Sequence, residues 1–456
     1  MTLAFRSDES SPFVRALLAD RGLAPGEVPL AIDARDEMLE FFLAEYDGDR
    51  ERALFTYLRS GASVAQTLVE VLRWRFGDLA RIGLVLDFAC GYGRVTRFLL
   101  RHFPKERVRV SDVYADAVRF QEERFGVRGI PSTLLPEDFS CAERFDAILV
   151  TSLFTHLPAD RFAGWLRRLL GLLRPGGVLL FSVHDEAVRD PGLAMPEAGI
   201  LFEARSESGS LQPGDYGSTW VTEEFVRGVV ARAAEAPVSL WHSPRALNDF
   251  QDLYAVFQEE GLDTSGLTVA AEPVLWIDRC FLERPDLLVL TGWSAQRGGR
   301  SREVQASLDG RVMAASPVDG LRADVAARFQ DERLAGSGWR LAVPLPPGVS
   351  RNAALLILRV VDSRGAGHPL WAGFLETALL EAARQDVEGL RRETIRLQGR
   401  LSTAEGWLVH VEAREKAGLA ALEARIAAME ASRFWKLRNA WFRLKRSLGF
   451  REKDSP

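Results

Sequence analysis

Hydrophobic and polar positions alternate differently in each part of the chain. In residues 1–80 the apolar residues stand three and four apart, and Ser60 and Gly61 break the spacing, which predicts a lead-in of helices. In residues 81–262 short apolar runs alternate with amphipathic stretches. This alternation predicts βαβ units and a parallel sheet with helices on both faces.

The pattern changes twice more toward the C-terminus. Residues 267–371 hold short strand-like runs separated by turn residues, and Asp309-Gly310 is a hairpin signal, which predicts a small all-β sandwich. Apolar residues of 374–431 follow a and d spacing with one four-residue slip, which predicts a coiled coil and hence a homo-oligomer. The coiled-coil stripe consists of Leu390, Leu397, Leu401, Leu408, Val411, Leu419, Leu422, Ile426 and Met429.

Residues 432–456 form a basic amphipathic tail. Arginines and lysines flank a single apolar stripe, as expected for a helix that lies on an anionic membrane surface. A helix that packs on a partner subunit has the same pattern, and both interpretations stay open. The stripe consists of Phe434, Leu437, Trp441, Leu444 and Leu448.

Composition narrows the class of protein. The chain has 456 residues, of which 47% are hydrophobic and 27% charged, as expected for a folded protein of two or three domains. A net charge of −5 provides no basic field for nucleic acid, so we expect no nucleic-acid partner. Because Cys90, Cys141 and Cys280 lack metal-ligand spacing, we predict neither a metal site nor a disulfide.

The sequence predicts a cytoplasmic location. The first residues, MTLAFRSDESS, contain no apolar signal core. No segment reaches the roughly 18 uninterrupted apolar residues that a membrane-spanning helix needs. Only the C-terminal tail is a candidate for peripheral contact with the inner face of the membrane.

The stretch LVLDFACGYGRVTRFLL, residues 84–100, is the candidate binding corner. A predicted strand ends in Asp87, a loop of small residues follows and a helix begins, so backbone N–H groups lie beside a carboxylate. A dinucleotide site needs a glycine where Thr96 stands, and Asp87 would repel its pyrophosphate. A cationic ligand with a small carboxylate and a nucleoside fits better, and S-adenosylmethionine is such a ligand.

This stretch resembles motif I of the class I S-adenosylmethionine-dependent methyltransferases. Ala89, Gly91 and Gly93 stand at the three small-residue positions of the motif, with Ala89 in place of the usual glycine. The resemblance implies a Rossmann-like, doubly wound α/β fold over residues 81–262. It also implies S-adenosylmethionine as the cofactor and methyl transfer as the activity.

Further residues follow the order of the same family. Asp112 ends the next predicted strand, where the family places an acidic residue that accepts both ribose hydroxyls. Asp138 and Phe139 stand where the family completes its adenine pocket, and Ser152 follows the fourth strand. The resemblance implies that all four contact the cofactor.

The acceptor side holds four candidate residues. His156 and His184 follow the fourth and fifth strands, and either is a candidate general base, although one of them is better explained as closing a turn. Tyr216 and Trp220 resemble the substrate-side insertion of the family, where aromatic rings stack on a sugar or fill the core. Tyr57, in the lead-in, is expected either to close over the cofactor or to pack in the core.

The sequence predicts O-methylation of a bacterial surface glycan or its lipid-linked precursor. The residues after FDAILV lack the N-P-P-aromatic run typical of methyltransferases that act on nucleic-acid amino groups. Methylation of a small soluble metabolite is one alternative, and a non-catalytic scaffold for glycan-assembly enzymes is another.

The predicted sandwich and the tail resemble segments of bacterial polysaccharide-building enzymes. Stretches such as GWSAQRGG and SGWRLAVPLP are similar to a β domain that is appended to bacterial glycosyltransferases. Trp276, Trp293 and Trp339 are therefore candidates for a sugar platform, whereas tryptophans at strand spacing more often fill a core.

Overall fold

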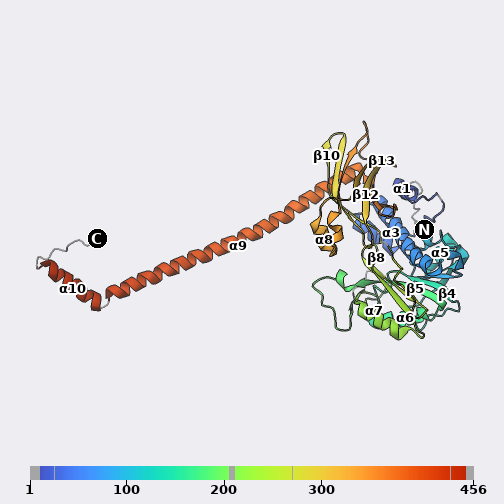
Figure 1. Cartoon of the computed structure of the whole chain (residues 1–456), viewed down its shortest axis with the longest axis horizontal. Helices are drawn as coiled ribbons and strands as arrows, with labels where there is room; N and C mark the ends of the chain where they lie inside the picture. Colours follow the sequence, from blue (N-terminus) through green and yellow to red (C-terminus); the bar gives the residue numbers. More distant parts are fainter. Residues whose placement is uncertain (1–10, 25, 205–210, 270, 432, 448–456) are drawn as a thin grey trace. The chain divides into compact units, whose positions relative to one another are not determined.

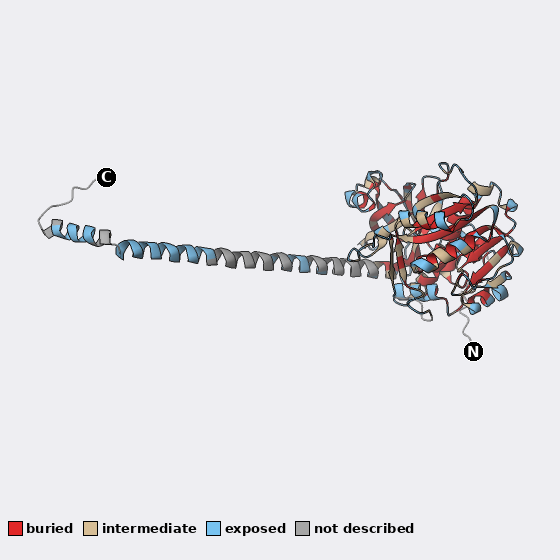
Figure 2. Ribbon diagram, turned by 90° about the horizontal axis from the view of Figure 1, so that it is seen from below, coloured by how far each residue is buried: buried red, intermediate tan, exposed pale blue. Residues whose placement is uncertain are grey.

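The chain folds into two compact units, Met1–Ala382 and Ala383–Pro456. The first unit contains all of the sheets and most of the helices (Figure 1). Figure 2 shows that its strands and inner helices are mostly buried. The computed structural model describes residues 11–24, 26–204, 211–269, 271–431 and 433–447.

Three helices form the N-terminal part of the first unit. Each begins at a side chain that accepts a hydrogen bond from a free N–H group of the first turn, namely Ser11, Asp36 and Asp49. The longest helix ends at Gly77, whose φ of 71° suits glycine. The helices are α1 (Pro12–Asp20), α2 (Glu37–Glu45) and α3 (Arg50–Phe76).

Helix α3 runs unbroken through Ser60 and Gly61, so a break in the lead-in at this point does not occur. Gly61 instead serves a close contact, because a Cβ at this position would lie 2.1 Å from the carbonyl oxygen of Arg94. The interruption in the apolar spacing therefore marks tight packing of the helix and not its end.

A parallel sheet in the order β3-β2-β1-β4-β5 forms the centre of the α/β part and confirms the Rossmann-like fold. Alternate residues of its strands face two separate cores, as with Val85 toward α1 and α3 and Leu86 toward α6 and α7. The strands are β1 (Val85–Phe88), β2 (Val108–Asp112), β3 (Arg128–Pro131), β4 (Phe145–Val150) and β5 (Leu173–Asp185). The helices are α4 (Thr96–Leu99), α5 (Ala115–Phe125), α6 (Ala159–Leu170) and α7 (Glu223–Ala233), with 3-10 turns η1 (Leu79–Arg81), η2 (Lys105–Arg107) and η3 (Glu186–Val188).

The sheet is mixed and not purely parallel, which corrects the prediction. Strand β9 pairs antiparallel with β5, and β8 pairs antiparallel with β9. A short hairpin of β6 and β7 joins the far end of β5, where His184 pairs with Trp220. These strands are β6 (Ile200–Glu203), β7 (Ser218–Val221), β8 (Ser239–Leu247) and β9 (Gln251–Phe257).

Two antiparallel sheets follow, and they share one core. Asp309 and Gly310 both have positive φ and form the predicted hairpin turn between β12 and β13. The segment is not all-β, because it includes helix α8 (Ala323–Phe329) and the 3-10 turn η4 (Glu332–Gly336). The first sheet has β10 (Val274–Arg284), β11 (Leu287–Ala295) and β14 (Gly338–Pro344), and the second has β12 (Ser301–Leu308), β13 (Arg311–Pro317), β15 (Leu355–Asp362) and β16 (Gly367–Phe374).

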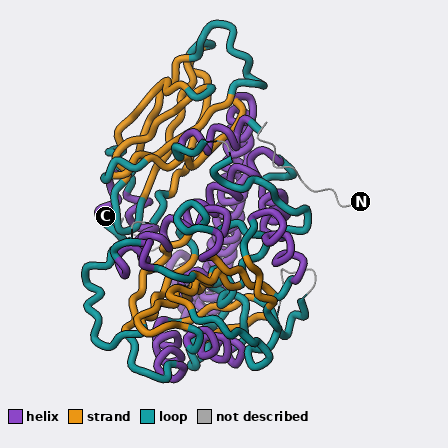
Figure 3. The backbone as a smooth tube through the Cα atoms, turned by 90° about the vertical axis from the view of Figure 1, so that its right-hand side faces the viewer, coloured by secondary structure: helices purple, strands orange, loops and turns teal. Residues whose placement is uncertain are grey.

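The N-terminal helices lie between the α/β part and the two antiparallel sheets (Figure 3). One hydrophobic core runs from the strands of the parallel sheet through α3 to Leu355 and Ile357 of β15. Arg21 and Arg59 both pair with the buried Glu272, at 3.1 and 2.5 Å. The first unit is therefore held together by its lead-in helices.

The C-terminal part of the chain is helical, with α9 (Leu375–Ala431) and α10 (Arg433–Ser447). Eight large apolar residues of the described part of α9 are exposed, namely Leu380, Ile395, Leu397, Leu401, Leu419, Leu422, Ile426 and Met429. The side chains of Leu390, Leu408, Val411 and Phe434, and all of Leu448, lie outside the described residues. Of the helices that the structure describes, none combines the length and apolarity needed to cross a bilayer.

We expect Gly61→Ala to destabilise the protein by about 1–3 kcal/mol, because the added methyl overlaps the Arg94 carbonyl. Gly228→Ala in α7 is the matched control, since a Cβ there meets first the flexible Arg232 side chain, at 3.2 Å. In an open helix position the same exchange stabilises by roughly 1 kcal/mol. Chemical denaturation followed by circular dichroism measures both. Equal effects of the two substitutions would contradict the close contact.

Candidate cofactor and acceptor site

The loop after β1 makes a sharp turn that only small residues tolerate. Ala89, Gly91 and Gly93 have φ values of 56°, 52° and 83°. Glycine adopts this left-handed region without strain, whereas an L-residue pays roughly 1–2 kcal/mol. The alanine at position 89 therefore occupies a backbone conformation that favours glycine.

The two glycines of the loop have different surroundings. A Cβ on Gly93 would lie 2.3 Å from the Phe125 ring, so this glycine lets the loop pack against α5. A Cβ on Gly91 would meet no atom within 4 Å. The N–H of Gly91 donates to Asp112 at 2.8 Å, which ties the loop to the end of β2. The loop therefore packs tightly against α5 at Gly93, whereas space for a ligand is left beside Gly91.

Two buried carboxylates flank this loop. Asp87 lies in β1 and is 1% exposed, and Asp112 ends the adjacent strand β2 and is 6% exposed. Burial, with a smaller contribution from the charge of Asp112, raises the pKa of Asp87 to about 7, although a hydrogen bond from the Thr96 hydroxyl at 2.6 Å acts in the opposite direction. Burial also raises the pKa of Asp112. A cationic ligand at this corner would relieve the repulsion.

A buried polar network from the N-terminal helices holds the loop from behind. Arg97 is fully buried and donates to the carbonyls of Tyr92 and Gly93. Its guanidinium lies 5.3 Å from the ring of Tyr57, whose hydroxyl donates to Asp36 at 2.5 Å. Tyr57 is fully buried in this network, so its packing interpretation is confirmed.

The two residues expected at the adenine side differ in their exposure to solvent. Asp138 is exposed in the segment between β3 and β4. Phe139 is 1% exposed, and its ring packs against Phe88 and Trp165, at centroid distances of 5.4 and 5.6 Å. The Phe139 side chain thus belongs to the core beneath β1, while its carbonyl accepts from Arg168.

The acceptor-side candidates come together at the carboxyl ends of β4 and β5. His156 follows β4 as predicted, whereas His184 lies within β5, one residue before its end, and does not follow the strand. His156 Nδ1 lies 2.7 Å from the carbonyl oxygen of Gly217, and its ring stacks on Tyr216 at 4.4 Å. The rings of His156 and His184 are 6.5 Å apart. Because β1, β4 and β5 are parallel neighbours, these residues and Asp87 share one edge of the sheet.

His184 is enclosed by aromatic rings. Trp220 lies 6.3 Å and Phe250 lies 4.8 Å from its ring centroid. Burial, with a contribution from His156, lowers the pKa of His184 to about 4. Its Nδ1 atom is buried and has no hydrogen-bond partner among the described residues. His184 is therefore neutral at neutral pH.

The predicted Ser152 belongs to a polar group at this edge, and the sequence did not reveal the other members, Ser182 and Gln251. Ser152 has a φ of 67°, and its N–H donates to the Ser182 hydroxyl at 2.9 Å. Gln251, at the start of β9, bonds to both serines. Neither Gln251 nor Phe250 could be found in advance, because the antiparallel strand that brings them here was not predicted.

Comparisons with known proteins point to one class. Residues 86–179 match the family model described as "Methyltransferase domain". The chain is 29% identical over 129 residues to malonyl-[acyl-carrier protein] O-methyltransferase of Bacillus cereus, covering 28% of this chain and 46% of that one. It is 30% identical over 117 residues to trans-aconitate 2-methyltransferase of Rhodopseudomonas palustris, covering 25% and 44%. The chain thus spans less than half the length of these curated relatives.

Solved structures of methyltransferases are also similar to this chain. An O-methyltransferase family protein from Burkholderia thailandensis has 20% identity and a TM-score of 0.33, with 55% of this chain and 72% of that chain covered. A 1,6-didemethyltoxoflavin-N1-methyltransferase from the same organism, with S-adenosylhomocysteine bound, has 20% identity and a TM-score of 0.32, with 49% and 88% covered.

The chain contains a class I S-adenosylmethionine-dependent methyltransferase domain, with S-adenosylmethionine as its cofactor. The corner around Gly91 fits this cofactor by its chemistry. Asp112 offers carboxylate oxygens to a ribose diol, and the buried charges of Asp87 and Asp112 favour a positively charged ligand. Among the described residues no cluster of histidine, cysteine and acidic side chains is placed to hold a metal ion.

We expect Asp87→Asn to have opposite effects on stability and on binding. The folded wild type binds the Asp87 proton more tightly, with a pKa of about 7 against 3.8, so its stability falls as the pH rises from about 4 to about 7. Above about pH 7 the ligand-free variant is therefore more stable than the ligand-free wild type. Its affinity for S-adenosylmethionine drops by roughly tenfold or more.

Thermal denaturation across this pH range and calorimetric titration with S-adenosylmethionine measure the two effects. Glu123→Gln on the exposed face of α5 is the control and changes neither. A variant that binds the cofactor as tightly as the wild type would remove Asp87 from the site.

Proposed function

We propose that this protein transfers a methyl group from S-adenosylmethionine to a hydroxyl group of its acceptor. The pair of buried carboxylates around the glycine loop, with two histidines at the neighbouring strand ends, is the observation that carries the proposal. When bound, S-adenosylmethionine supplies a methyl group activated by the sulfonium charge. Asp112 holds the ribose and Asp87 the amino acid portion, and the remaining tasks are alignment and proton removal.

His156 takes up the proton that the acceptor hydroxyl loses. A carbonyl oxygen only accepts hydrogen bonds, so His156 Nδ1 donates to Gly217 and the lone pair of the neutral ring is on Nε2. Tyr216 stacks on the imidazole and fixes its plane. The same Nδ1 contact also anchors the turn after β4. His156 is therefore proposed both to close this turn and to act as the general base.

His184 orients the acceptor and does not take its proton. A pKa of about 4 makes its protonated form unfavourable at neutral pH, which makes it a weak base. The buried Nδ1 of its neutral ring is suited to a hydrogen bond with an acceptor hydroxyl.

We propose a glycan, or a lipid-linked glycan precursor, as the acceptor. Tyr216, Trp220 and Phe250 surround the two histidines, and Phe250 is 49% exposed. Aromatic faces of this kind pack against sugar rings, while histidines recognise hydroxyls. A small organic acid is the second candidate, because the curated relatives include one named for malonyl-[acyl-carrier protein] and one named for trans-aconitate.

We further propose that helix α9 pairs with a second copy of the chain. Its exposed apolar residues include Leu419, Leu422, Ile426 and Met429, which repeat at intervals of three and four.

The basic helix α10 is proposed to contact the cytoplasmic face of the membrane. Analytical ultracentrifugation tests the pairing, and a lack of co-sedimentation with anionic vesicles would exclude the membrane contact.

We expect labelled methyl groups from S-adenosylmethionine to enter lipid-linked glycan extracts and to remain on sugars after the product is degraded. Asp112→Ala is the control for transfer at this site, because it removes the carboxylate that accepts from the Gly91 N–H. Small organic acids are assayed in parallel. Label in an acid and none in glycan would overturn the glycan proposal and leave methyl transfer intact.

Replacing His156 separates the hydroxyl and carboxylate acceptors. With a hydroxyl acceptor, we expect His156→Gln to lower kcat about 10²–10⁴-fold, because no group takes the proton. With a carboxylate acceptor, which has no proton to lose at neutral pH, kcat changes little. His184→Gln mainly raises KM, and His102→Gln, outside this cluster, is the control. Unchanged binding of S-adenosylmethionine by all three variants shows that the site is intact.

A further inference from the structure

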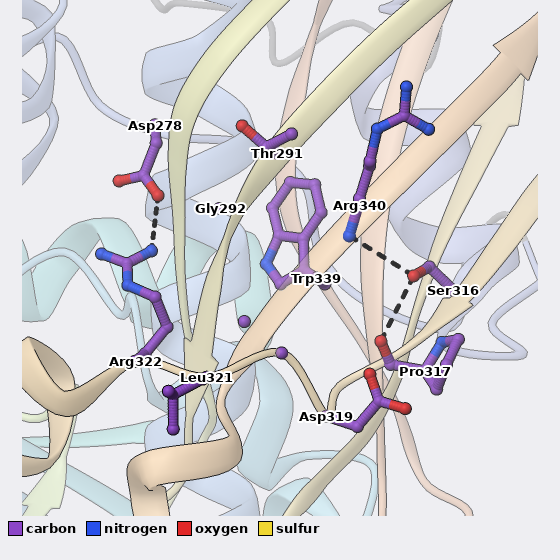
Figure 4. A pocket seen from close by; sticks show the side chains of 12 residues that line it. Asp278, Thr291, Gly292, Ser316, Pro317, Asp319, Leu321, Arg322, Trp339 and Arg340 are labelled. Carbon is purple, nitrogen blue, oxygen red and sulfur yellow. Dashed lines mark hydrogen bonds and ion pairs between the residues drawn. The ribbon is translucent and has the colours of Figure 1, made fainter.

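The two antiparallel sheets contain an open pocket of about 390 Å³, apart from the methyltransferase site. This volume is typical of small-molecule sites. Strands β10, β11, β13 and β14 and the segment 319–322 supply its walls (Figure 4). Nothing in the methyl-transfer mechanism uses these residues.

Three glycines line this pocket, and close packing accounts for each of them. A Cβ on Gly292 would lie 1.9 Å from the Trp276 carbonyl and 2.7 Å from the Trp339 ring. Gly320 and Gly338 pair across an isolated bridge, where a Cβ on either would lie about 3 Å from the other's backbone. None of these glycines has a positive φ. They bring polar backbone within reach of a ligand.

Trp339 has an unsatisfied hydrogen-bond donor in this pocket. The residue is 5% exposed, and its indole nitrogen is buried without an acceptor among the described residues. A buried donor left unpaired costs roughly 1–3 kcal/mol. Figure 4 shows this nitrogen on the side of the ring toward Arg322. The neighbouring Leu321 is 84% exposed and can move aside at little cost.

The charged side chains of the pocket balance. The pocket is lined by two acidic residues, Asp278 and Asp319, and by two basic residues, Arg322 and Arg340. Asp278 pairs with Arg322 at 2.5 Å. Within the described part of the chain, no side chain pairs with the Asp319 carboxylate. The Thr291 hydroxyl adds a donor and an acceptor, whereas the Ser316 hydroxyl already donates to the Pro317 carbonyl and accepts from the Arg340 N–H. A phosphate group would require a surplus of cations, which this pocket lacks.

We propose that this pocket binds a neutral saccharide unit. A sugar offers many hydroxyls and no net charge, which matches a wall of mixed donors and acceptors with one aromatic ring. Asp319 accepts from sugar hydroxyls, and the Trp339 indole donates to a sugar oxygen. An apolar ligand would leave these polar groups unpaired.

The saccharide pocket goes beyond the proposed function and does not depend on it. Binding here is measured at equilibrium without S-adenosylmethionine, so it can fail while methyl transfer is retained. The reverse holds equally, since a scaffold without turnover would still bind the sugar.

The test titrates the full chain with methyl glycosides of mannose, galactose, glucose, N-acetylglucosamine and rhamnose. Saturation-transfer NMR and tryptophan fluorescence report binding. At least one glycoside is expected to bind with a dissociation constant of about 1 mM, as its small size implies. Trp339→Phe and Asp319→Asn each weaken that binding about tenfold. Trp293→Phe, a buried tryptophan outside the pocket lining, is the matched control and leaves it unchanged.

Three outcomes would overturn the proposal. They are no saturable binding of any glycoside, equal binding by the wild type and both pocket variants, and binding of inorganic phosphate in place of the sugars. Asp319 is exposed, so Asp319→Asn keeps the test valid even if Trp339→Phe fails to fold. Unchanged calorimetric binding of S-adenosylmethionine by the variants confirms that the methyltransferase site is intact.

Discussion

Repulsion between two buried carboxylates is the constraint on which the methyltransferase site depends. Parallel pairing of β1 and β2 places Asp87 and Asp112 at the same edge, where little water screens them. The protein meets part of this cost with backbone N–H groups from Gly91 and Tyr114 and with the Thr96 hydroxyl. The remaining imbalance favours a ligand that carries positive charge.

The glycine loop keeps its shape because other parts of the chain hold it. Ala89, Gly91 and Gly93 adopt a backbone that short isolated segments rarely keep. Arg97 bonds to loop carbonyls, and the pair of Tyr57 and Asp36 buries that arginine beneath the N-terminal helices. The N-terminal helices thus support the geometry of the binding corner, and Tyr57 contributes to it by packing.

Local pattern was enough to predict the parallel sheet and the glycine corner. Alternating apolar runs identify βαβ units, and the same pattern places Asp87 one residue before the end of β1 and Asp112 at the end of β2. The sequence could not predict that β9 pairs antiparallel with β5, because the apolar run of residues 251–257 suits either direction. Phe250 and Gln251 were missed for that reason. The sequence also could not predict that the helix continues through Gly61, because a glycine that permits a tight contact gives the same sequence pattern as a glycine that ends a helix.

The contact of Gly61 with the Arg94 carbonyl also affects how this protein can be divided into fragments. The segment that resembles methyltransferases begins at residue 86, yet the residues that support its loop come from 29–61. A fragment cut at the boundary of the resemblance would expose the underside of the loop and leave the Arg97 charge without its cover. The stretch that matches the family model is therefore shorter than the stretch that supports the binding corner.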